Sequence, residues 1–522
     1  MSTITDYDVV SDYGDVSLLP VSEHTDAYAG KHKAAYLALT VAGTAVLLII
    51  YMLSKTISWE NATAAGVVFG LTVIAIHIAW RLRTRPRNYL SPDIFYLIFY
   101  AAFHFSYLAL WLVGIVDAAG RAGERVFPAP RQYPLVMLIV NLGLLGFLFG
   151  YELAAPRRRF DTLTQPRKTP TALWTIVGIV FMLAALITHL AFIFHVGIAT
   201  WLSQGYTVYI HMEEFSQYDR LWRFQFQFFA LGFGIYITSV ALRYRRLFKG
   251  KLGIILFSIY LFLLAMEGGR TQLVTHGMII LLVRHFVIKP IKLRWLIVIS
   301  ICALTAFTLI KLVRQTAAFN IPKMIETVGE AQKAEEIHWY DSFVEMGSSI
   351  GTVNLTTAVV PSPYPYWHGR SYIQAITHII PYMSVVLMPY LGASPSVWLT
   401  DVFYGAGAAG TGFSIAAEGY LNFGLVGAFM HMAVLGIILR WIYARFATTM
   451  SPVSTLVFIV AYGLFMITVR NHVNLLISPL VKVIVVAWLL KSFCGEEEVA
   501  AVGYEEAELA ESESENYERV YV

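Results

Sequence analysis

Charged residues are scarce in this 522-residue sequence, where they make up 14% of the chain. An ordinary soluble domain carries about 25%. The deficit comes from repeated apolar runs, each close to the roughly 20 residues that cross a bilayer as a helix. A membrane β-barrel would instead show alternating segments of about 10 residues. The composition therefore predicts an all-α polytopic membrane protein.

Cysteine is nearly absent. The two that occur, Cys302 inside an apolar run and Cys494 after the last one, would lie at different depths, so we expect no disulfide. A cleavable signal peptide is not visible either, because the first thirty residues are polar and acidic and the first apolar run begins near Ala35. Metal ligands at a recognisable spacing are also lacking, since His211, Glu213 and Glu214 are close in sequence without forming a known motif. We expect no metal and no other cofactor.

Hydropathy predicts twelve spans, and basic clusters follow every even-numbered one up to the eighth. The spans are residues 35–54, 62–80, 92–116, 134–154, 171–195, 225–242, 252–267, 271–288, 295–313, 422–439, 453–469 and 474–491. The basic clusters lie in 81–87, 157–168, 243–251 and 284–294. Short loops rich in Lys and Arg stay in the cytoplasm. Both termini are therefore predicted to be cytoplasmic. Because this topology accounts for the basic clusters, we expect no nucleic-acid partner.

This topology divides the chain into five parts. They are a disordered cytosolic tail (1–34), spans one to nine (35–313), a long periplasmic loop with interfacial helices (314–421), spans ten to twelve (422–491) and an acidic cytosolic tail (492–522). Within the loop, 371–399 is apolar enough to resemble a span, but three prolines interrupt it. A proline inside a helix costs about 3 kcal/mol or more, so we expect an interfacial or re-entrant element. If the segment did span, Arg440 and Arg445 would face outward.

Three arginines are predicted at the outward face, where positive charge is otherwise rare. Arg270 lies between spans seven and eight in the sequence GGR, Arg314 follows span nine, and Arg470 follows span eleven. Arginine binds phosphate through two parallel hydrogen bonds, so the three favour a site for an anionic lipid head group. Snorkelling to ordinary headgroups is the alternative. Glu267, one turn before Arg270, would orient or neutralise it.

The long loop carries the other candidate groups. Glu418 would serve as a general base or pair with an arginine as a structural residue. His368 and His378 are further candidates for proton transfer, although a lone histidine is more often structural. Aromatic residues that would stack on sugar rings, or pack at the lipid interface, are Tyr364, Tyr366, Trp367 and Tyr420. The run GAGAAGTG at 405–412 matches GxGxxG without a surrounding strand and helix, so a turning loop is expected there.

Two stretches carry a resemblance to a known family. EGGRTQLVTHGMIILL resembles the Gly-x-Arg-Thr hairpin of Wzy-type O-antigen, capsule and exopolysaccharide repeat-unit polymerases. HGRSYIQAITHIIP, followed by GTGFSIAAEGYLNFGLVGAF, is similar to their pattern G-x-S-Y, I-P, G-F-S and E-x-Y-x-N-F-G-x-x-G. Twelve spans with one long periplasmic loop also resemble this family and the O-antigen ligases. The likeness of motifs covers about residues 260–440.

The resemblance implies a GT-C-like glycosyltransferase of the bacterial inner membrane with a periplasmic active site. Donor and acceptor would be undecaprenyl-pyrophosphate-linked oligosaccharides, joined without nucleotide, metal or other cofactor. Membrane lipids, a chain-length regulator and a flippase would be partners. Arg270 and Arg370 match the motifs as pyrophosphate-binding residues, although Arg370 departs from the residue type usual after His-Gly; Arg314 and Arg470 are assigned by topology. Glu418 matches as the base, with His378 behind it.

Two other functions remain open. An O-antigen ligase would share the donor site and use lipid A–core as its acceptor. A lipid or oligosaccharide transporter would place ionisable residues at mid-membrane and show internal repeats. We find no convincing repeat, and the candidate charges gather at the outer boundary.

Overall fold

The computed structural model describes most of the chain as helices. It covers residues 25–84, 89–116, 130–155, 168–204, 219–267, 270–315, 338, 340–380, 383–405 and 412–498. The helices of the first half are α1 (Thr25–Leu53), α2 (Trp59–Thr84), α3 (Pro92–His104), α4 (Ser106–Leu112), η1 (Pro130–Gln132), α5 (Tyr133–Leu153), α6 (Ala172–Val196), α7 (Ile198–Gln204), α9 (Asp219–Tyr244) and α10 (Lys251–Met266). Those of the second half are α11 (Arg270–Leu282), η2 (Val283–Ile288), α12 (Leu293–Gln315), α14 (Asp341–Gly347), α15 (Ile350–Val359), α16 (Arg370–Thr377), α17 (Met383–Leu391), α18 (Pro395–Tyr404), α19 (Ile415–Thr449), α20 (Pro452–Thr468) and α21 (Asn474–Cys494).

Six helices within the described residues are long and apolar enough to cross a membrane, and a seventh span results if α3 and α4, bent by 57°, count as one. The other five predicted spans fall on α9, α10, α11 with η2, α12 and α20, whose described apolar stretches are 10–17 residues long. Each predicted span thus coincides with helix. The chain is a helical membrane protein, while the number twelve stays a prediction.

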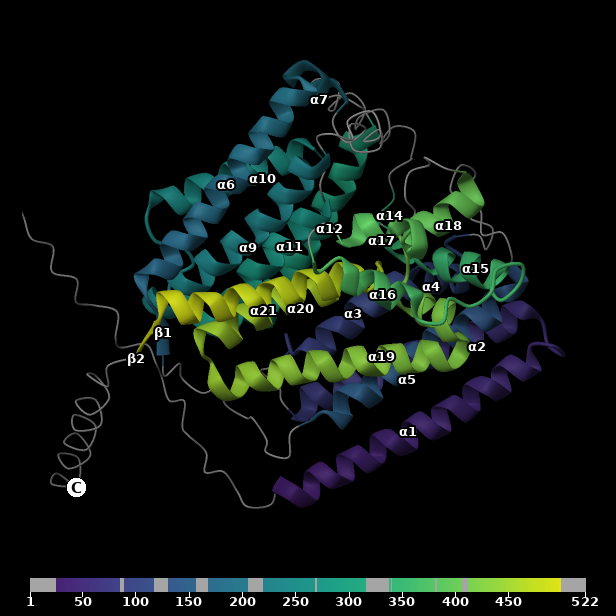
Figure 1. Cartoon of the computed structure of the whole chain (residues 1–522). Helices are drawn as coiled ribbons and strands as arrows, with labels where there is room; N and C mark the ends of the chain where they lie inside the picture. The colour runs from purple at the N-terminus through teal and green to yellow at the C-terminus, as the bar shows by residue number, and fades with distance from the viewer. Residues whose placement is uncertain are drawn as a thin grey trace, which may run out of the picture.

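The helices form one bundle with different features at its two ends (Figure 1). The short helices α14–α18 gather toward one end. At the other end, β1 (Lys168–Pro170) pairs antiparallel with β2 (Glu496–Glu498), with Thr169 opposite Glu497. The expectation of purely helical structure therefore needs this small correction. Thr171 donates to the Cys494 carbonyl at 2.7 Å, which ties the start of α6 to the end of α21. Both cysteines are free, as expected.

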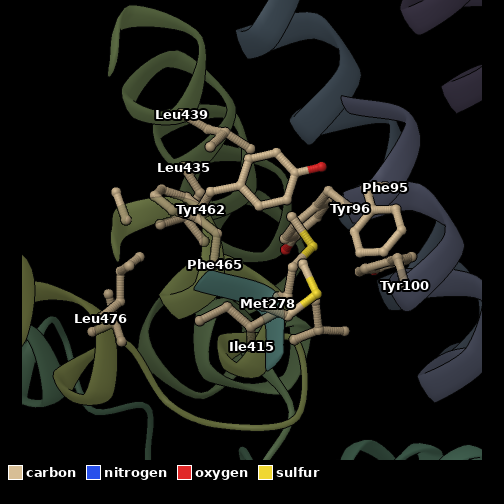
Figure 2. Packing of buried hydrophobic residues seen from close by; sticks show 14 of the residues in the cluster. Phe95, Tyr96, Tyr100, Met278, Ile415, Leu435, Leu439, Tyr462, Phe465 and Leu476 are labelled. Atoms are coloured by element: carbon tan, nitrogen blue, oxygen red, sulfur yellow. The ribbon is translucent and has the colours of Figure 1, made fainter. Parts of the chain in front are cut away.

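The centre of the bundle is the close contact of α5 with α19. In α5, a methyl group on Gly146 would overlap the carbonyl oxygen of Phe429 in α19, and one on Gly150 would overlap that of Ala433. Small residues allow such backbone contact between membrane helices, where packing rather than the hydrophobic effect drives association. Aromatic and aliphatic side chains from α3, α11, α19, α20 and α21 belong to the buried core, part of which Figure 2 shows.

The proline-interrupted segment 371–399 contains no single spanning helix. Its described residues form α16, α17 and the start of α18, and Pro389 lies inside α17. Both Pro381 and its neighbour at 382 lie outside the described residues. Pro395 begins α18, whereas Pro389 does not divide α17.

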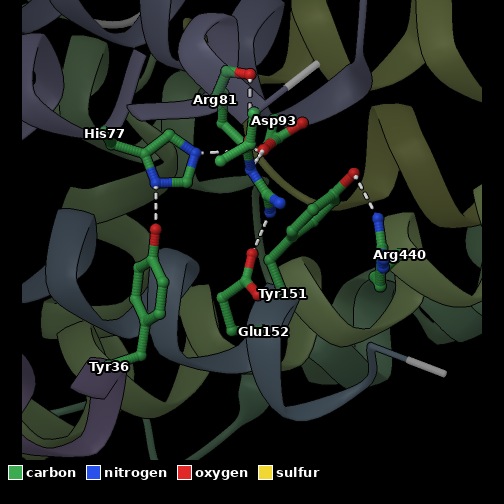
Figure 3. Close-up of polar contacts among 8 residues, drawn as sticks. Tyr36, His77, Arg81, Asp93, Tyr151, Glu152 and Arg440 are labelled. Atoms are coloured by element: carbon green, nitrogen blue, oxygen red, sulfur yellow. Dashed lines mark hydrogen bonds and ion pairs between the residues drawn. The ribbon is translucent and has the colours of Figure 1, made fainter. Parts of the chain in front are cut away.

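Four charged residues from four helices meet where α2 ends and α3 begins (Figure 3). Arg81 of α2 donates from Nε to Asp93 of α3 at 2.6 Å and from Nη2 to Glu152 of α5. Arg440 of α19 donates to the Tyr151 hydroxyl at 3.4 Å. All four charged side chains are buried. Two cations and two carboxylates balance, which a buried ionic cluster requires.

A histidine extends this cluster to α1. His77 approaches Asp93 with Nε2 at 3.0 Å and Tyr36 with Nδ1 at 2.7 Å. A neutral imidazole that donates from Nε2 and accepts the Tyr36 hydroxyl satisfies both contacts. The sequence had placed Arg81 among loop charges and treated Arg440 as a topology marker. The loop placement of Arg81 is wrong, because Arg81 is a buried residue of α2, and both arginines belong to an interior network that joins α1, α2, α3, α5 and α19. The topology argument from Arg440 stays a prediction.

We predict that Arg81→Met destabilises the fold. It would leave two buried carboxylates without their cation, and breaking a buried pair costs about 3–5 kcal/mol. Arg83→Met is the matched control, since Arg83 is exposed in the same last turn of α2. Thermal unfolding of both variants in detergent should show a lower midpoint for Arg81→Met alone. Equal midpoints would mean that the network does not stabilise the bundle.

Candidate active site

Glu418 lies in the first turn of α19. Ser414 is the N-cap of this helix, and its Oγ accepts the Ala417 N–H at 3.5 Å. The Glu418 carboxylate is fully buried and accepts the Val473 N–H through Oε2 at 2.6 Å. Such a donor is needed because an unpaired buried carboxylate is costly. Val473 directly precedes α21, so this bond fixes the start of α21 against the start of α19.

Asn422, one turn after Glu418, holds the chain that leads into α16. Its Oδ1 accepts the Gly369 N–H at 3.0 Å, and its Nδ2 donates to the Ser371 hydroxyl at 2.8 Å. Its carbonyl accepts the His368 N–H at 3.0 Å. Gly369 adopts a left-handed φ of 89°, which glycine reaches at little cost. The segment 368–371 is therefore bound to α19 through both main chain and side chain.

Tyr372 extends the same contact. Its hydroxyl lies 2.7 Å from His431 Nδ1 of α19, and the two rings stack with centroids 5.3 Å apart. Burial raises the pKa of the Tyr372 phenol, with the Glu418 carboxylate adding to the effect, so the phenol remains protonated and donates. The two sequence patterns that carry the resemblance, HGRSY and E-x-Y-x-N-F-G, thus pack directly against each other.

A break in α19 follows these contacts. Phe423 and Gly424 have non-helical angles, and Gly424 has a φ of 65° and a ψ of −149°. A methyl group at Gly424 would also press on the Tyr366 hydroxyl at 3.1 Å. Both the angle and the contact favour glycine. The break separates the first two turns of α19, which hold Glu418 and Asn422, from its long remainder.

Arg370 and Arg470 lie in the two segments that these contacts attach to α19. The Arg370 guanidinium lies over the Trp367 ring, 4.4 Å from its centroid, and donates from Nε to the Leu391 carbonyl. Partial burial lowers the pKa of this guanidinium without removing its charge. Arg470 follows α20, and its carbonyl accepts the Phe413 N–H at 3.3 Å. It lies three residues before Val473, so both arginines are linked to Glu418 through short contacts.

His378, His368 and His472 are three of the histidines at this end of the bundle. His378 ends α16, where its side chain is exposed and its carbonyl accepts the Ser478 hydroxyl of α21 at 2.8 Å. His368 is exposed as well, with a φ of 49°. His472 was not singled out in the sequence; it is buried beside Val473. Burial, with a smaller contribution from His378, lowers the pKa of His472 to about 4, which keeps it neutral at pH 7.

The aromatic candidates divide into open and buried rings. Tyr364 and Trp367 both pack edge-on against Trp398 of α18, with centroids 5.6 and 5.2 Å apart, while Tyr364 remains exposed. Tyr366 meets Tyr420 edge-on at 5.8 Å. Tyr420 is only 4% exposed and donates to the Val360 carbonyl at 3.3 Å, which is a packing position. Of the four rings, Tyr364 is exposed, Tyr366 and Trp367 are half-buried and Tyr420 is buried.

Arg270 and Arg314 are placed only by their main chains. Arg270 begins α11 and Arg314 lies in the last turn of α12, and their side chains are outside the described part of the structure. Glu267, expected to act on Arg270, accepts His189 Nε2 at 2.5 Å and Trp201 Nε1 at 3.1 Å, while its relation to the Arg270 side chain lies outside the described residues. This buried carboxylate ties the end of α10 to α6 and α7, directly before residues 268–270.

Sequence reasoning missed part of the core. Asn422 stood inside the quoted pattern without an assigned role, and the polar triplet Arg470–His472 between two apolar spans was a usable signal for His472. Ser371 likewise stood in the quoted G-x-S-Y pattern without an assigned role. No comparable signal marks Val473, because its contact with Glu418 joins segments about 50 residues apart. Within the residues that the structure covers, no three His, Cys, Asp or Glu side chains cluster as metal ligands, and His211, Glu213 and Glu214 lie outside that part.

Comparison with known proteins points to one family. The profile of the O-antigen polysaccharide polymerase Wzy family matches residues 36–497. Protein CapE of Staphylococcus aureus is 24% identical over 297 residues, an alignment that spans 55% of this chain and 59% of CapE. No solved structure matches the chain significantly. The family match includes both packed motifs and nearly all the described helices, so this chain belongs to the O-antigen polysaccharide polymerase Wzy family.

Proposed function

We propose that this protein polymerises undecaprenyl-pyrophosphate-linked oligosaccharide units at the periplasmic face of a bacterial inner membrane. The growing chain passes en bloc from its carrier to the non-reducing end of a newly delivered unit, in a GT-C-type reaction without metal. Family membership supports the polymerase class. The observation that carries the proposal is the convergence of Arg370, Arg470, His378 and the Glu418–Val473 contact at one end of the bundle.

Arginine supplies the charge that this reaction needs. When the C1–oxygen bond of the donor breaks, negative charge develops on the departing pyrophosphate. Fixed cations aimed at that charge lower the barrier without reorganising, and guanidinium keeps its charge when partly buried. We assign pyrophosphate binding to Arg270, Arg314, Arg370 and Arg470. Because Arg370 already contacts Trp367 and the Leu391 carbonyl, it also fixes the position of α16.

Proton transfer is assigned to His378 rather than to Glu418. The acceptor hydroxyl must lose its proton as its oxygen bonds to C1, and the proton must pass to an accessible base. The His378 side chain is exposed and histidine commonly fills this role, with His368 as a second exposed candidate. Glu418 is fully buried and already bonded to Val473. We therefore assign Glu418 as a positioning residue that holds the Arg470–Val473 turn.

The function is tested with purified protein in nanodiscs, a lipid-linked repeat unit and a chelator. We expect a ladder of glycans that differ by whole repeat units. If a folded preparation gives no ladder with its cognate unit, the polymerase assignment fails. Supplying lipid A–core as the acceptor separates the alternatives, since a ligase would join one chain to it without forming a ladder.

We predict opposite behaviour for two Glu418 variants. Glu418→Gln should keep activity within about tenfold, because its amide oxygen still accepts the Val473 N–H and only the stronger bond to a carboxylate is lost. Glu418→Ala should lose most activity. His378→Gln should lower kcat by about 10² to 10⁴. Steady-state kinetics on folded variants checks all three; an inactive Glu418→Gln beside an active His378→Gln would make Glu418 the base.

We also predict that Arg270→Ala lowers turnover by about 10² to 10³, the usual loss for one transition-state donor. Expression and folding should be unchanged. Arg270→Lys should restore only part of the activity, because an ammonium cannot make the paired hydrogen bonds of guanidinium. Arg294→Ala is the control, since Arg294 is exposed at the start of α12. Full activity in Arg270→Ala would remove this residue from the site.

A further inference from the structure

His104 is a fully buried histidine where α3 meets α4, in the half of the chain that supplies none of the candidate site residues. It is the last residue of α3. Phe105 follows with a φ of −117°, and α4 continues at an angle of 57° to α3. Buried polar groups in proteins are hydrogen-bonded. The partners of the two His104 ring nitrogens therefore show what this corner holds.

The two ring nitrogens of His104 contact two different helices. Nδ1 lies 3.2 Å from the Tyr100 carbonyl, one turn earlier in α3, and Nε2 lies 2.7 Å from the Ser414 hydroxyl, 310 residues later in the chain. A carbonyl oxygen can only accept, so Nδ1 carries the proton. A neutral imidazole has one N–H. Nε2 is therefore an acceptor, and the Ser414 hydroxyl donates to it.

The His104 ring is held in place by its neighbours. It stacks on Tyr100 with ring centroids 4.3 Å apart, and Tyr100 donates its hydroxyl to the Val140 carbonyl of α5 at 2.8 Å. A methyl group on Gly143 of α5 would lie 3.0 Å from the Tyr100 hydroxyl and 3.6 Å from the Ala416 Cβ in the first turn of α19. Close packing of this kind leaves the ring one orientation, which is the orientation that meets α19.

Ser414 connects this corner to the candidate active site. Its hydroxyl proton goes to His104, while its Oγ accepts the Ala417 N–H at 3.5 Å. Its carbonyl accepts the Glu418 N–H at 3.0 Å. An N-cap side chain satisfies the donors of the first helical turn only in the orientation that points its oxygen at them. His104 thus fixes the side chain that begins the turn carrying Glu418.

The corner between α3 and α4 also holds a second segment of the long loop. Ser106, the first residue of α4, has its Oγ 2.7 Å from the Phe343 carbonyl of α14. A methyl group on Gly347, at the end of α14, would overlap the main-chain nitrogen of Tyr107. Contacts on both sides of the bend hold the corner against α14 and α19 together. It is therefore a fixed support for the start of α19.

We propose that His104 is a positioning residue for the polymerase reaction and acts by holding the Ser414 hydroxyl that caps α19. This assignment rests on the proposed function. Without the Nε2 acceptor, the buried hydroxyl turns to another acceptor, and Oγ leaves the Ala417 N–H. The first turn of α19 then loosens, and Glu418 no longer holds residues 470–473 in place. His104 does not touch the substrate, so its loss slows turnover and leaves binding intact.

Steady-state kinetics of His104→Leu tests this assignment. We expect kcat to fall by about 10- to 100-fold, because a displacement of about 1 Å can cost 10²-fold in rate. KM should stay within about threefold of the parent value. His104→Gln should keep kcat within about threefold, because its amide oxygen can accept the Ser414 hydroxyl. Phe103→Leu is the matched control, since Phe103 precedes His104 on α3 and is half-buried. It should behave like the parent protein.

A double-mutant cycle separates one shared role from two independent ones. Ser414→Ala should lower kcat at least as much as His104→Leu. The double variant should lose no more than Ser414→Ala alone, because both changes remove the same hydrogen bond. Losses that multiply would overturn the proposal, and so would a parental kcat in His104→Leu or a folded but inactive His104→Gln. If His104→Leu does not fold, His104→Asn replaces it with the same expected loss, since its side chain is too short to reach Ser414.

Amide hydrogen exchange gives a readout that does not depend on activity. In His104→Leu, the Ala417 and Glu418 amides should exchange about three- to thirtyfold faster, the range that follows from loss of an N-cap contact. Protection of α3 and α5 should be unchanged. Unchanged exchange at Ala417 and Glu418, or faster exchange throughout α3 and α5, would contradict the positioning role. If the parent protein makes no polymer, the proposed function fails, while exchange at the start of α19 still decides whether His104 holds Ser414.

Discussion

The hydrogen bond from the Val473 N–H to the buried Glu418 carboxylate is the contact on which the geometry of the site depends. It joins the first turn of α19 to the first residue before α21. Asn422, one turn further, attaches the segment that begins α16. Arg370, His378 and Arg470 all lie within a few residues of these attachments. A carboxylate buried in this way must keep its donor, so the arrangement is held firmly.

The opposite end of the bundle supplies the rigid base for this arrangement. Arg81, Asp93 and Glu152 bind one another between α2, α3 and α5, and Arg440 brings α19 to the same cluster. Between the two ends, glycines let α5 and α19 touch along their backbones. One helix, α19, therefore carries Arg440 of the charge network toward its end and Glu418 at its start. Close packing between the helices fixes the distance between the charge network and Glu418.

Hydropathy predicted the helices well because a spanning helix appears in the sequence as one continuous apolar run. Each predicted span coincides with helix. The motif resemblance also singled out two distant segments that lie together in the fold, since HGRSY and the pattern around Glu418 pack against each other. The partners of individual polar residues could not be predicted. Arg81 looked like a loop charge beside its basic neighbours, because burial and tertiary partners leave no periodic signal in the sequence.

The central claim is that the end holding Glu418, Arg370 and Arg470 faces the periplasm. Labelling spheroplasts with an impermeant thiol reagent tests it most directly, in a chain whose Cys302 and Cys494 are replaced by Ser. Ser362→Cys lies in an exposed turn at that end, and Thr448→Cys is exposed at the other. The account predicts that Ser362→Cys reacts before lysis and Thr448→Cys only after it. The reverse order would place the candidate site in the cytoplasm and contradict the account.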